Sequence, residues 1–291
     1  MRTFSVIFLG LGIAMLLGCG SSKHVNGTKL PGTWQEQAVV VDGDSKEWPS
    51  PYPAYDAKAK IGYAISNDKK NLYLTVETGD VMTQMKILRS GMTVWIDTSG
   101  GKTERAGIDY PLPSENTGMQ NERGQESGTD QATVQSMDRE KRMQAHARRA
   151  LDDAIQLSLE GFGSCSGGFL VKQDNSCGIK VRMAIDEYNE MIWEAAIPLK
   201  VLYGKDEIEK KDEGRPLSVC FSIKALKRPE KPKEQSGGMN DGGGGMRGGG
   251  GGGMRGGGHG GGMHGSGEGN SDRQAMFEAT KTWKQFGLAY K

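Results

Sequence analysis

Residues 61–76 read Ile-Gly-Tyr-Ala-Ile-Ser-Asn-Asp-Lys-Lys-Asn-Leu-Tyr-Leu-Thr-Val, and this stretch decides the fold class. Both halves alternate large apolar residues with small or polar ones, and the apolar positions are Ile61, Tyr63, Ile65, Leu72, Leu74 and Val76. Between the halves, residues 67–71 have the composition of a turn. The pattern predicts a β-hairpin that buries one face of each strand.

Similar short segments recur along the chain and predict further strands, at 92–97, 155–159, 169–173, 179–185, 191–197, 217–226 and 281–291. Residues 38–48 read as a short strand, a turn and an aromatic residue, and residues 80–90 as one short helix. Many short strands separated by turn signals are typical of a sandwich or barrel rather than of βαβ units. We therefore expect an all-β fold, an antiparallel β-sandwich of the immunoglobulin or jelly-roll kind, spanning residues 34–291.

Two segments interrupt this pattern. Residues 114–154 begin as a polar stretch and continue as an amphipathic helix from about 131 to 155, with Ala147, Leu151 and Ile155 on one face. In residues 236–270, 21 of the 35 residues are glycine. Fixing glycine backbones costs much conformational entropy. We expect an inserted helix in the first segment and a disordered, glycine-rich loop in the second.

The N-terminus has the layout of a secretory signal. Arg2 precedes an apolar run, and Leu16-Leu17-Gly18-Cys19 resembles a bacterial lipobox. Residues 1–18 are then a signal peptide, Cys19 carries the lipid, and residues 19–33 form a polar tether. The alternative is an ordinary signal peptide with a chance cysteine. Gly20 favours a cell-envelope lipoprotein in the outer membrane of a Gram-negative bacterium.

The charge and the positions of the histidines disfavour several classes of function. The net charge is +1, from 37 basic and 36 acidic residues, so no basic field exists to attract nucleic acid. The four histidines lie outside the predicted strands, at His24, His146, His259 and His264. This disfavours a catalytic triad or a histidine zinc site, and we expect a protein that is not an enzyme. Glu187, Glu190 and Glu194 could hydrolyse glycosides as paired carboxylates, but they also fit ordinary charge on a wet strand face.

Three cysteines lie beyond Cys19. Cys165 and Cys177 flank an apparent hairpin, and in an oxidising compartment they could form a disulfide. The alternative is two buried or free thiols. Cys220 lies in an apolar strand and fits the core.

Several motifs, in order, resemble a family 9 carbohydrate-binding module and the related DOMON domains. They are Val41-Asp42-Gly43 with Trp48, Tyr63-Ala64-Ile65-Ser66-Asn67-Asp68, Asn71-Leu72-Tyr73-Leu74, Thr93-Val94-Trp95-Ile96-Asp97 and Trp193-Glu194-Ala195-Ala196-Ile197-Pro198. The resemblance implies a β-sandwich and, more loosely, a saccharide ligand in a cleft walled by aromatic side chains. The two long insertions depart from the family pattern.

The candidate ligand-binding residues are Trp95, Asp97, Trp48 and Trp193. Trp95 shares a strand face with Asp97 and faces outward if Met92, Val94 and Ile96 face the core; otherwise it covers a sheet edge or the inserted helix. Alternatively, Trp48 plugs one end of the sandwich and Trp193 lies in the core. Tyr52 and Tyr55 are further exposed candidates.

Asp42 and Asp44 could supply oxygens to calcium, which related modules bind structurally, although aspartate in turns commonly bonds the backbone alone. No other cofactor is expected. The sequence thus predicts a non-catalytic, carbohydrate-binding-like envelope lipoprotein that holds glycan. The alternative is an envelope interaction or scaffold lipoprotein without a sugar ligand, whose partners are other envelope proteins.

Overall fold

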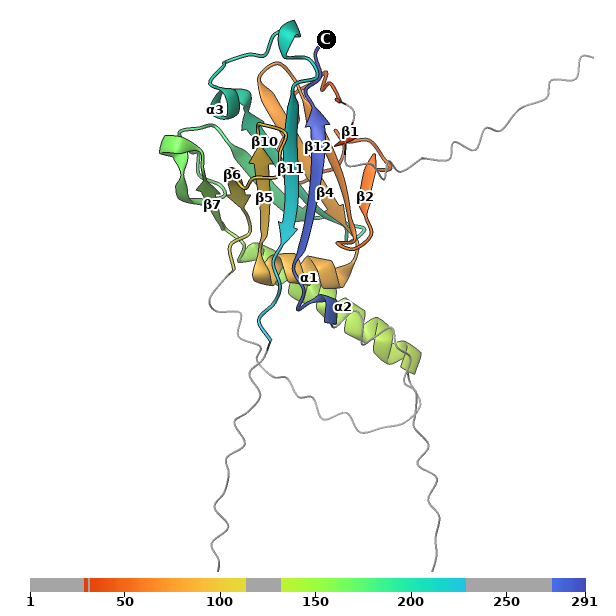
Figure 1. The fold of residues 1–291 in the computed structure, drawn as a ribbon. Coiled ribbons are helices and arrows are strands. Elements are labelled where there is room, and N and C mark those ends of the chain that lie inside the picture. The colour runs from red at the N-terminus through yellow and green to blue at the C-terminus, as the bar shows by residue number, and fades with distance from the viewer. Residues whose placement is uncertain (1–28, 31, 114–131, 229–273) are drawn as a thin grey trace, which may run out of the picture.

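The computed structural model describes residues 29, 30, 32–113, 132–228 and 274–291 (Figure 1). The predicted signal peptide, the lipidation site Cys19, most of the tether, the polar part of the insertion and the glycine-rich loop lie outside the described residues. Within the described part of the chain, no helix is both long and apolar enough to cross a membrane.

Two sheets face each other and form the predicted β-sandwich (Figure 1). The seven-stranded sheet contains, in spatial order, β1 (Lys29–Leu30), β12 (Thr280–Gly287), β11 (Pro216–Ile223), β5 (Met92–Asp97), β6 (Ala106–Asp109), β7 (Gln156–Glu160) and β8 (Gly167–Leu170). The five-stranded sheet contains β2 (Ala54–Asp56), β3 (Ile61–Asn67), β4 (Asn71–Thr78), β10 (Met191–Pro198) and β9 (Lys180–Ile185). All pairs are antiparallel except β1 with β12.

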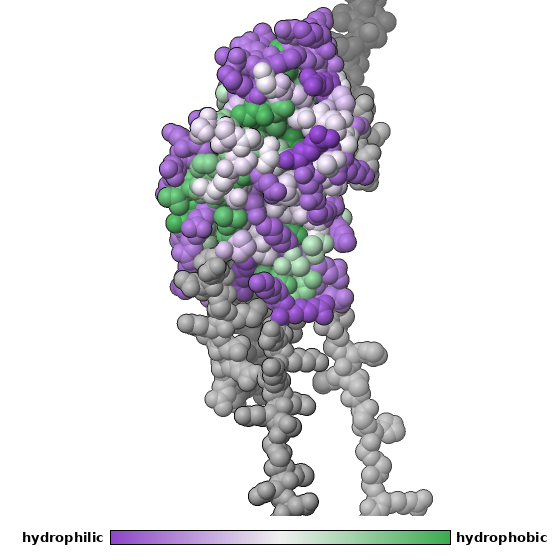
Figure 2. All heavy atoms as spheres, turned by 60° about the vertical axis from the view of Figure 1, so that its left-hand side comes forward, coloured by the Kyte–Doolittle hydropathy of each residue, from purple (hydrophilic) through white to green (hydrophobic). Residues whose placement is uncertain are grey.

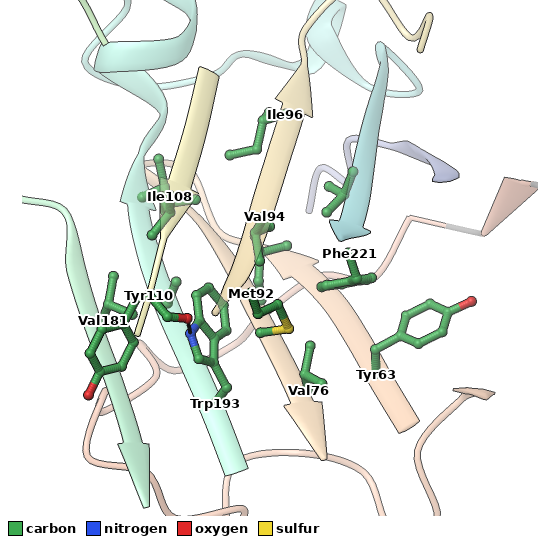
Figure 3. Close-up of a cluster of buried hydrophobic side chains, with 14 of the residues drawn as sticks. Tyr63, Val76, Met92, Val94, Ile96, Ile108, Tyr110, Val181, Trp193 and Phe221 are labelled. Carbon is green, nitrogen blue, oxygen red and sulfur yellow. Dashed lines mark hydrogen bonds between the residues drawn. The ribbon is translucent and has the colours of Figure 1, made fainter. Parts of the chain in front are cut away.

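The core fills the space between the sheets, where alternate side chains of every long strand meet. Figure 3 shows Met92, Val94 and Phe221 from the seven-stranded sheet opposite Val76 and Trp193 from the five-stranded sheet. Because side chains alternate between faces along a strand, the intervening residues point to the outer face of each sheet. This alternation confirms the predicted hairpin, whose Ile61, Tyr63 and Ile65 are buried.

Helices α1 and α2 lie at one end of the sandwich. Helix α1 (Val81–Ser90) starts at Asp80, whose side chain accepts the Thr83 N–H, and it ends at Gly91. Helix α2 (Ala132–Asp152), the inserted helix, packs against α1 (Figure 1). Its Ala147 is fully buried. Ile155 lies beyond the helix and is 48% exposed, so its predicted place on the buried helix face was wrong.

Several elements differ from the sequence prediction. Residues 38–48 form a loop instead of a short strand, because they cross the outer face of the five-stranded sheet without pairing to it. The end of the predicted tether, Lys29–Leu30, forms strand β1. The pattern also missed β2 and β6, which are only 3 and 4 residues long, and the helix α3 (Leu199–Tyr203).

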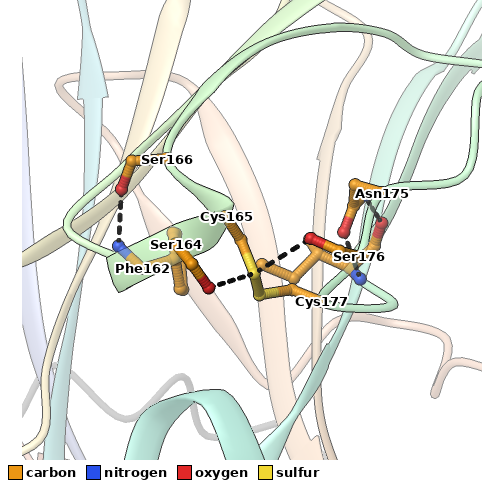
Figure 4. The surroundings of a disulfide bond; sticks show 8 residues. Phe162, Ser164, Cys165, Ser166, Asn175, Ser176 and Cys177 are labelled. Atoms are coloured by element: carbon orange, nitrogen blue, oxygen red, sulfur yellow. Dashed lines mark hydrogen bonds between the residues drawn. A yellow bond between two sulfur atoms is a disulfide. The ribbon is translucent and has the colours of Figure 1, made fainter.

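A disulfide joins Cys165 to Cys177, the pair that the sequence offered for a bridge (Figure 4). It closes the loop that contains β8, at the edge of the seven-stranded sheet. Around it, the Ser166 hydroxyl accepts the Phe162 N–H, and the Asn175 side chain bonds the backbone of Ile179 in both directions. The third cysteine, Cys220, is buried and free.

Candidate functional site

The Asp-Gly and Trp48 motif covers the outer face of the five-stranded sheet instead of forming a ligand site. Glu194, on β10, is buried and accepts three hydrogen bonds from this segment. Its Oε1 accepts the Trp48 Nε1–H at 2.6 Å, and its Oε2 accepts the backbone N–H groups of Asp42 at 3.1 Å and Gly43 at 2.8 Å. Trp48 itself packs against Val39, Tyr52 and Tyr73, among others. The structure therefore places Trp48 in a buried position on the outer face of the sheet.

Electrostatics agree with this role. Burial raises the pKa of Glu194, and the hydrogen bonds from Trp48, Gly43 and Asp42 only partly offset that rise. A buried carboxylate that accepts several bonds from one segment holds that segment in place. Gly43 contributes through its positive φ of 89° and its close approach to Ala184, which leaves no room for a side chain.

Trp193 and Asp97 are also structural. Trp193 lies in the core, 1% exposed, and its Nε1–H donates to the Tyr110 carbonyl at 3.2 Å (Figure 3). Asp97 is buried at the turn after β5, where it accepts the N–H groups of Ser99 at 3.0 Å and Thr103 at 2.9 Å. Burial alone would raise the pKa of Asp97, but these bonds and the charge of Arg105 outweigh burial and lower it. Neither residue presents a surface to a ligand.

Asp42 and Asp44, the suggested calcium ligands, bond nearby backbone. Asp42 accepts the Asp44 N–H at 2.9 Å, and Asp44 accepts the Lys46 N–H at 3.1 Å. These are Asx turns, the ordinary role of aspartate in loops. Among the described residues, no group of three or more histidine, cysteine, aspartate or glutamate side chains could hold a metal ion.

Trp95 does point outward, as its strand pattern predicted. Met92, Val94 and Ile96 are buried in the core, and Trp95 lies partly buried on the other face of β5. Trp95 is paired across the sheet with Gly107 on β6 and with Cys220 on β11. Cys220 is in turn paired with Trp283 on β12. A side chain at position 107 would meet the Trp95 ring at 2.6 Å, so the indole lies over the glycine backbone.

A concave site lies on the outer face of the other sheet. Its volume is about 340 Å³, and its lining residues include Tyr52, Tyr55, Gly62, Glu77 and Glu190. The register explains the hollow: Tyr55 on β2, Gly62 on β3 and Glu77 on β4 are directly paired across the sheet. Gly62 has no side chain, and the Tyr52 ring lies against its backbone, so the floor of the hollow between the tyrosine and the carboxylate is formed by Gly62 and Tyr52. We call this site the Tyr55–Glu77 groove.

The groove is aromatic on one side and acidic on the other. Tyr55 is 47% exposed, whereas Tyr52 is buried below it, with its hydroxyl 3.4 Å from Thr75 Oγ1. Across the groove, Glu190 lies against the backbone of Gly79, where a side chain would meet the carboxylate at 2.5 Å. Gly79 therefore allows Glu190 to approach Glu77.

Both carboxyl groups of the groove, those of Glu77 and Glu190, have raised pKa values. Burial and then the charge of Glu190 raise the pKa of Glu77, while burial and then Asp186 raise the pKa of Glu190. Carboxyl groups with raised pKa values in a cleft are typical of functional sites. The backbone at Glu190 is held in place, because Asp186 accepts the N–H of Glu190 at 2.8 Å and Arg148 of α2 donates to the Asp186 carbonyl at 2.7 Å.

Sequence reasoning identified parts of this groove but did not assemble it. Tyr52, Tyr55 and Glu190 were noticed as separate candidates, whereas Glu77 read as an ordinary polar residue of the hairpin. The available signal was the pair of glycines, Gly62 within a strand and Gly79 just after one. Glycine inside or beside a strand often marks a place where a ligand or another group approaches closely.

Comparisons with known proteins add a similarity to solved structures. No protein-family model matches the sequence, and no curated protein matches it. Among solved structures, the chain is similar to a family 9 carbohydrate-binding module from Caldicellulosiruptor kristjanssonii in complex with glucose, which is the family that its motifs resemble. The match has a TM-score of 0.30 and 10% sequence identity, and it covers 67% of this chain and 78% of that chain.

Proposed function

We propose that this protein binds saccharide without cutting it, and that the Tyr55–Glu77 groove is the binding site. The observation that carries this proposal is the paired row of Tyr55, Gly62 and Glu77, which sets an exposed ring and a carboxylate on either side of a hollow. An aromatic ring stacks on the C–H face of a sugar, and carboxylates accept bonds from its hydroxyl groups. A volume of about 340 Å³ accommodates one or two sugar units.

The proposal includes a lipid anchor. Cys19 follows the apolar N-terminal run and would carry the lipid, which holds the sandwich at the bacterial envelope. From that position the sandwich would retain glycan near other envelope proteins. Metabolic labelling with a radioactive fatty acid tests the anchor: wild-type protein should take up label, and Cys19→Ser should not.

The test of saccharide binding is a glycan-array screen followed by calorimetric titration with the best glycan. Tyr55→Ala and Glu77→Gln should each weaken binding at least tenfold, by roughly the strength of one stacking or charge-assisted contact. Leu170→Ala is the matched control, because Leu170 is 48% exposed, close to the 47% of Tyr55, and lies on β8 of the other sheet. It should leave the affinity unchanged.

Trp95→Ala separates this proposal from the site that the sequence suggested. If saccharide binding is lost in Trp95→Ala and kept in Tyr55→Ala, the ligand lies on the face with Trp95 and Trp283, and the groove is not the site. Under our proposal, Trp95 covers Gly107 and its replacement changes stability but not affinity.

The second candidate function is an envelope scaffold without a sugar ligand. One observation favours it: the large apolar side chains of Ile155 and Leu170 are each 48% exposed near the β7–β8 edge. Figure 2 shows apolar surface gathered on the side of the molecule that carries these strands, within a mostly polar surround. Exposed apolar patches commonly mark protein contacts. A negative glycan screen, with envelope proteins captured by wild type and not by Leu170→Asp, would favour this function.

A further inference from the structure

A second pocket, lined by other residues than the Tyr55–Glu77 groove, lies where α1 closes the end of the sandwich. It has a volume of about 100 Å³. Its walls come from the segment before β3, from α1, from the end of β11, and from the start of β12 with the segment that leads into it. Its apolar lining includes Met82, Ile223 and Met276, and its polar lining includes Lys58, Lys86 and Thr280.

Lys86 is a buried cation in this lining. It is 7% exposed, and its ammonium group donates to the backbone carbonyl oxygens of Ala275, at 3.0 Å, and Glu278. Among the described residues, the ion pairs do not include Lys86. Burial lowers its pKa, and the more distant charge of Glu278 only partly offsets this. Because an ammonium group has three N–H donors, one remains for a further acceptor.

Thr280 provides an independent observation. The residue is 6% exposed, and its hydroxyl oxygen is buried without a hydrogen-bond partner among the described residues. Burying a hydroxyl group without a partner is costly, and such groups are uncommon in folded proteins. Thr280 lines the same pocket as Lys86, so an acceptor bound there can take bonds from both.

The charges around the pocket favour an anion. Lys58 is exposed and acts on Lys86, whose pKa its charge lowers further. Asp80, also in the lining, is already engaged, since it pairs with Lys60 at 2.9 Å and caps α1 through Thr83. Glu278, the other acid of the lining, is exposed, and its side chain accepts a hydrogen bond from Gln274 at 3.4 Å. An incoming anion therefore meets two lysines whose charges no ion pair neutralises among the described residues.

We propose that this pocket binds a small carboxylate with a short apolar chain. The carboxylate accepts from Lys86 and Thr280, and the chain contacts Met82, Ile223 and Met276. A cavity of about 150 Å³ holds a six-carbon ring, so the smaller pocket here suits an acid of about four carbons. Longer fatty acids do not fit, and neutral molecules of the same shape leave the buried ammonium group without its anion.

The experiment titrates the full chain with sodium butyrate, followed by calorimetry and by ligand-observed NMR. Butyramide, which has the same shape and no charge, is the control ligand, and octanoate is the control for size. Butyrate should bind saturably and at least tenfold more tightly than either. Thr280→Val keeps the shape of the side chain and removes the unpartnered hydroxyl, so it should fold at least as stably as wild type while weakening butyrate binding about tenfold.

Matched variants complete the test. Lys86→Met should abolish the preference for butyrate over butyramide. Thr93→Val alters a buried threonine on the outer face of the seven-stranded sheet, and it should leave butyrate affinity unchanged. The proposal is overturned if butyrate does not bind, if butyramide binds equally well, or if Thr280→Val binds butyrate like wild type. Saccharide affinity measured on the same variants keeps this result separate from that of the groove.

Discussion

Replacing Glu194 with alanine should destabilise the protein substantially. The substitution leaves two buried donors without an acceptor, the Gly43 N–H and the Trp48 Nε1–H. Each unsatisfied buried donor costs about 1–3 kcal/mol, which gives about 2–6 kcal/mol for the pair. Losing the carboxylate also removes its own desolvation cost, so we expect a net loss of about 3 kcal/mol. For a domain of this size, that corresponds to a Tm lower by about 6–12 °C.

Urea unfolding followed by tryptophan fluorescence measures this loss. Glu194→Gln is a milder change. Its amide oxygen can still accept from the N–H groups of Asp42 and Gly43, while its NH₂ group opposes the Trp48 N–H. Glu194→Gln should therefore lose less stability than Glu194→Ala. Glu187→Ala, on the exposed turn before β10, is the control and should stay within about 0.5 kcal/mol of wild type. A Glu194→Ala variant as stable as this control would refute the assignment of Glu194 as the residue that holds the 42–48 loop.

Three further outcomes are expected. Replacing both Cys165 and Cys177 with serine opens a loop with a sequence separation of 12 residues and should cost up to about 3 kcal/mol in urea unfolding under oxidising conditions; reduced wild type should behave like the variant. Glu77→Gln should be more stable than wild type at neutral pH. A raised carboxyl pKa stabilises the fold only while the group is protonated, and that contribution is lost as pH rises through the folded-state pKa, so the advantage should disappear in unfolding curves below about pH 4. Gly79→Ala should displace the flexible Glu190 carboxylate and weaken saccharide binding in calorimetry with little change in stability; unaltered affinity would remove Glu190 from the site.

The fold was largely predictable because its strands carry a local signal. The hairpin of β3 and β4 alternates apolar and polar residues over its whole length, and β10 and β11 are long apolar runs. Strand β6 was not predictable, since Gly107 interrupts its pattern and is compensated by Trp95 from another strand. The 38–48 segment looked like a strand because Val39 and Val41 are apolar, yet they pack on top of a sheet. In both segments, β6 and 38–48, contacts with residues distant in sequence determine the structure.

The candidate site was less predictable for the same reason. Tryptophans are the residues that a sequence reader connects with sugar binding, but Trp48 and Trp193 are large apolar side chains that the fold buries, each with its N–H group bonded. The groove depends on the register that pairs Tyr55 with Gly62 and Gly62 with Glu77. Tyr55 and Glu77 are 22 positions apart, and no local pattern relates them. Only the sheet pairing reveals that a glycine separates an exposed ring from a carboxylate.

Two carboxylates on the same sheet face, Glu194 and Glu77, have different surroundings. Glu194 and Glu77 both lie on the outer face of the five-stranded sheet, and burial raises the pKa of each. Three donors from the 42–48 segment bond Glu194 and partly offset the cost of its burial. Glu77 lies in the groove beside Glu190, whose charge raises the pKa of Glu77 further, while a hydrogen bond with Tyr52 lowers it in part. A fold that needed only stability would gain by replacing Glu77 with a neutral residue. Under our proposal, sugar hydroxyl groups donate hydrogen bonds to these two acids.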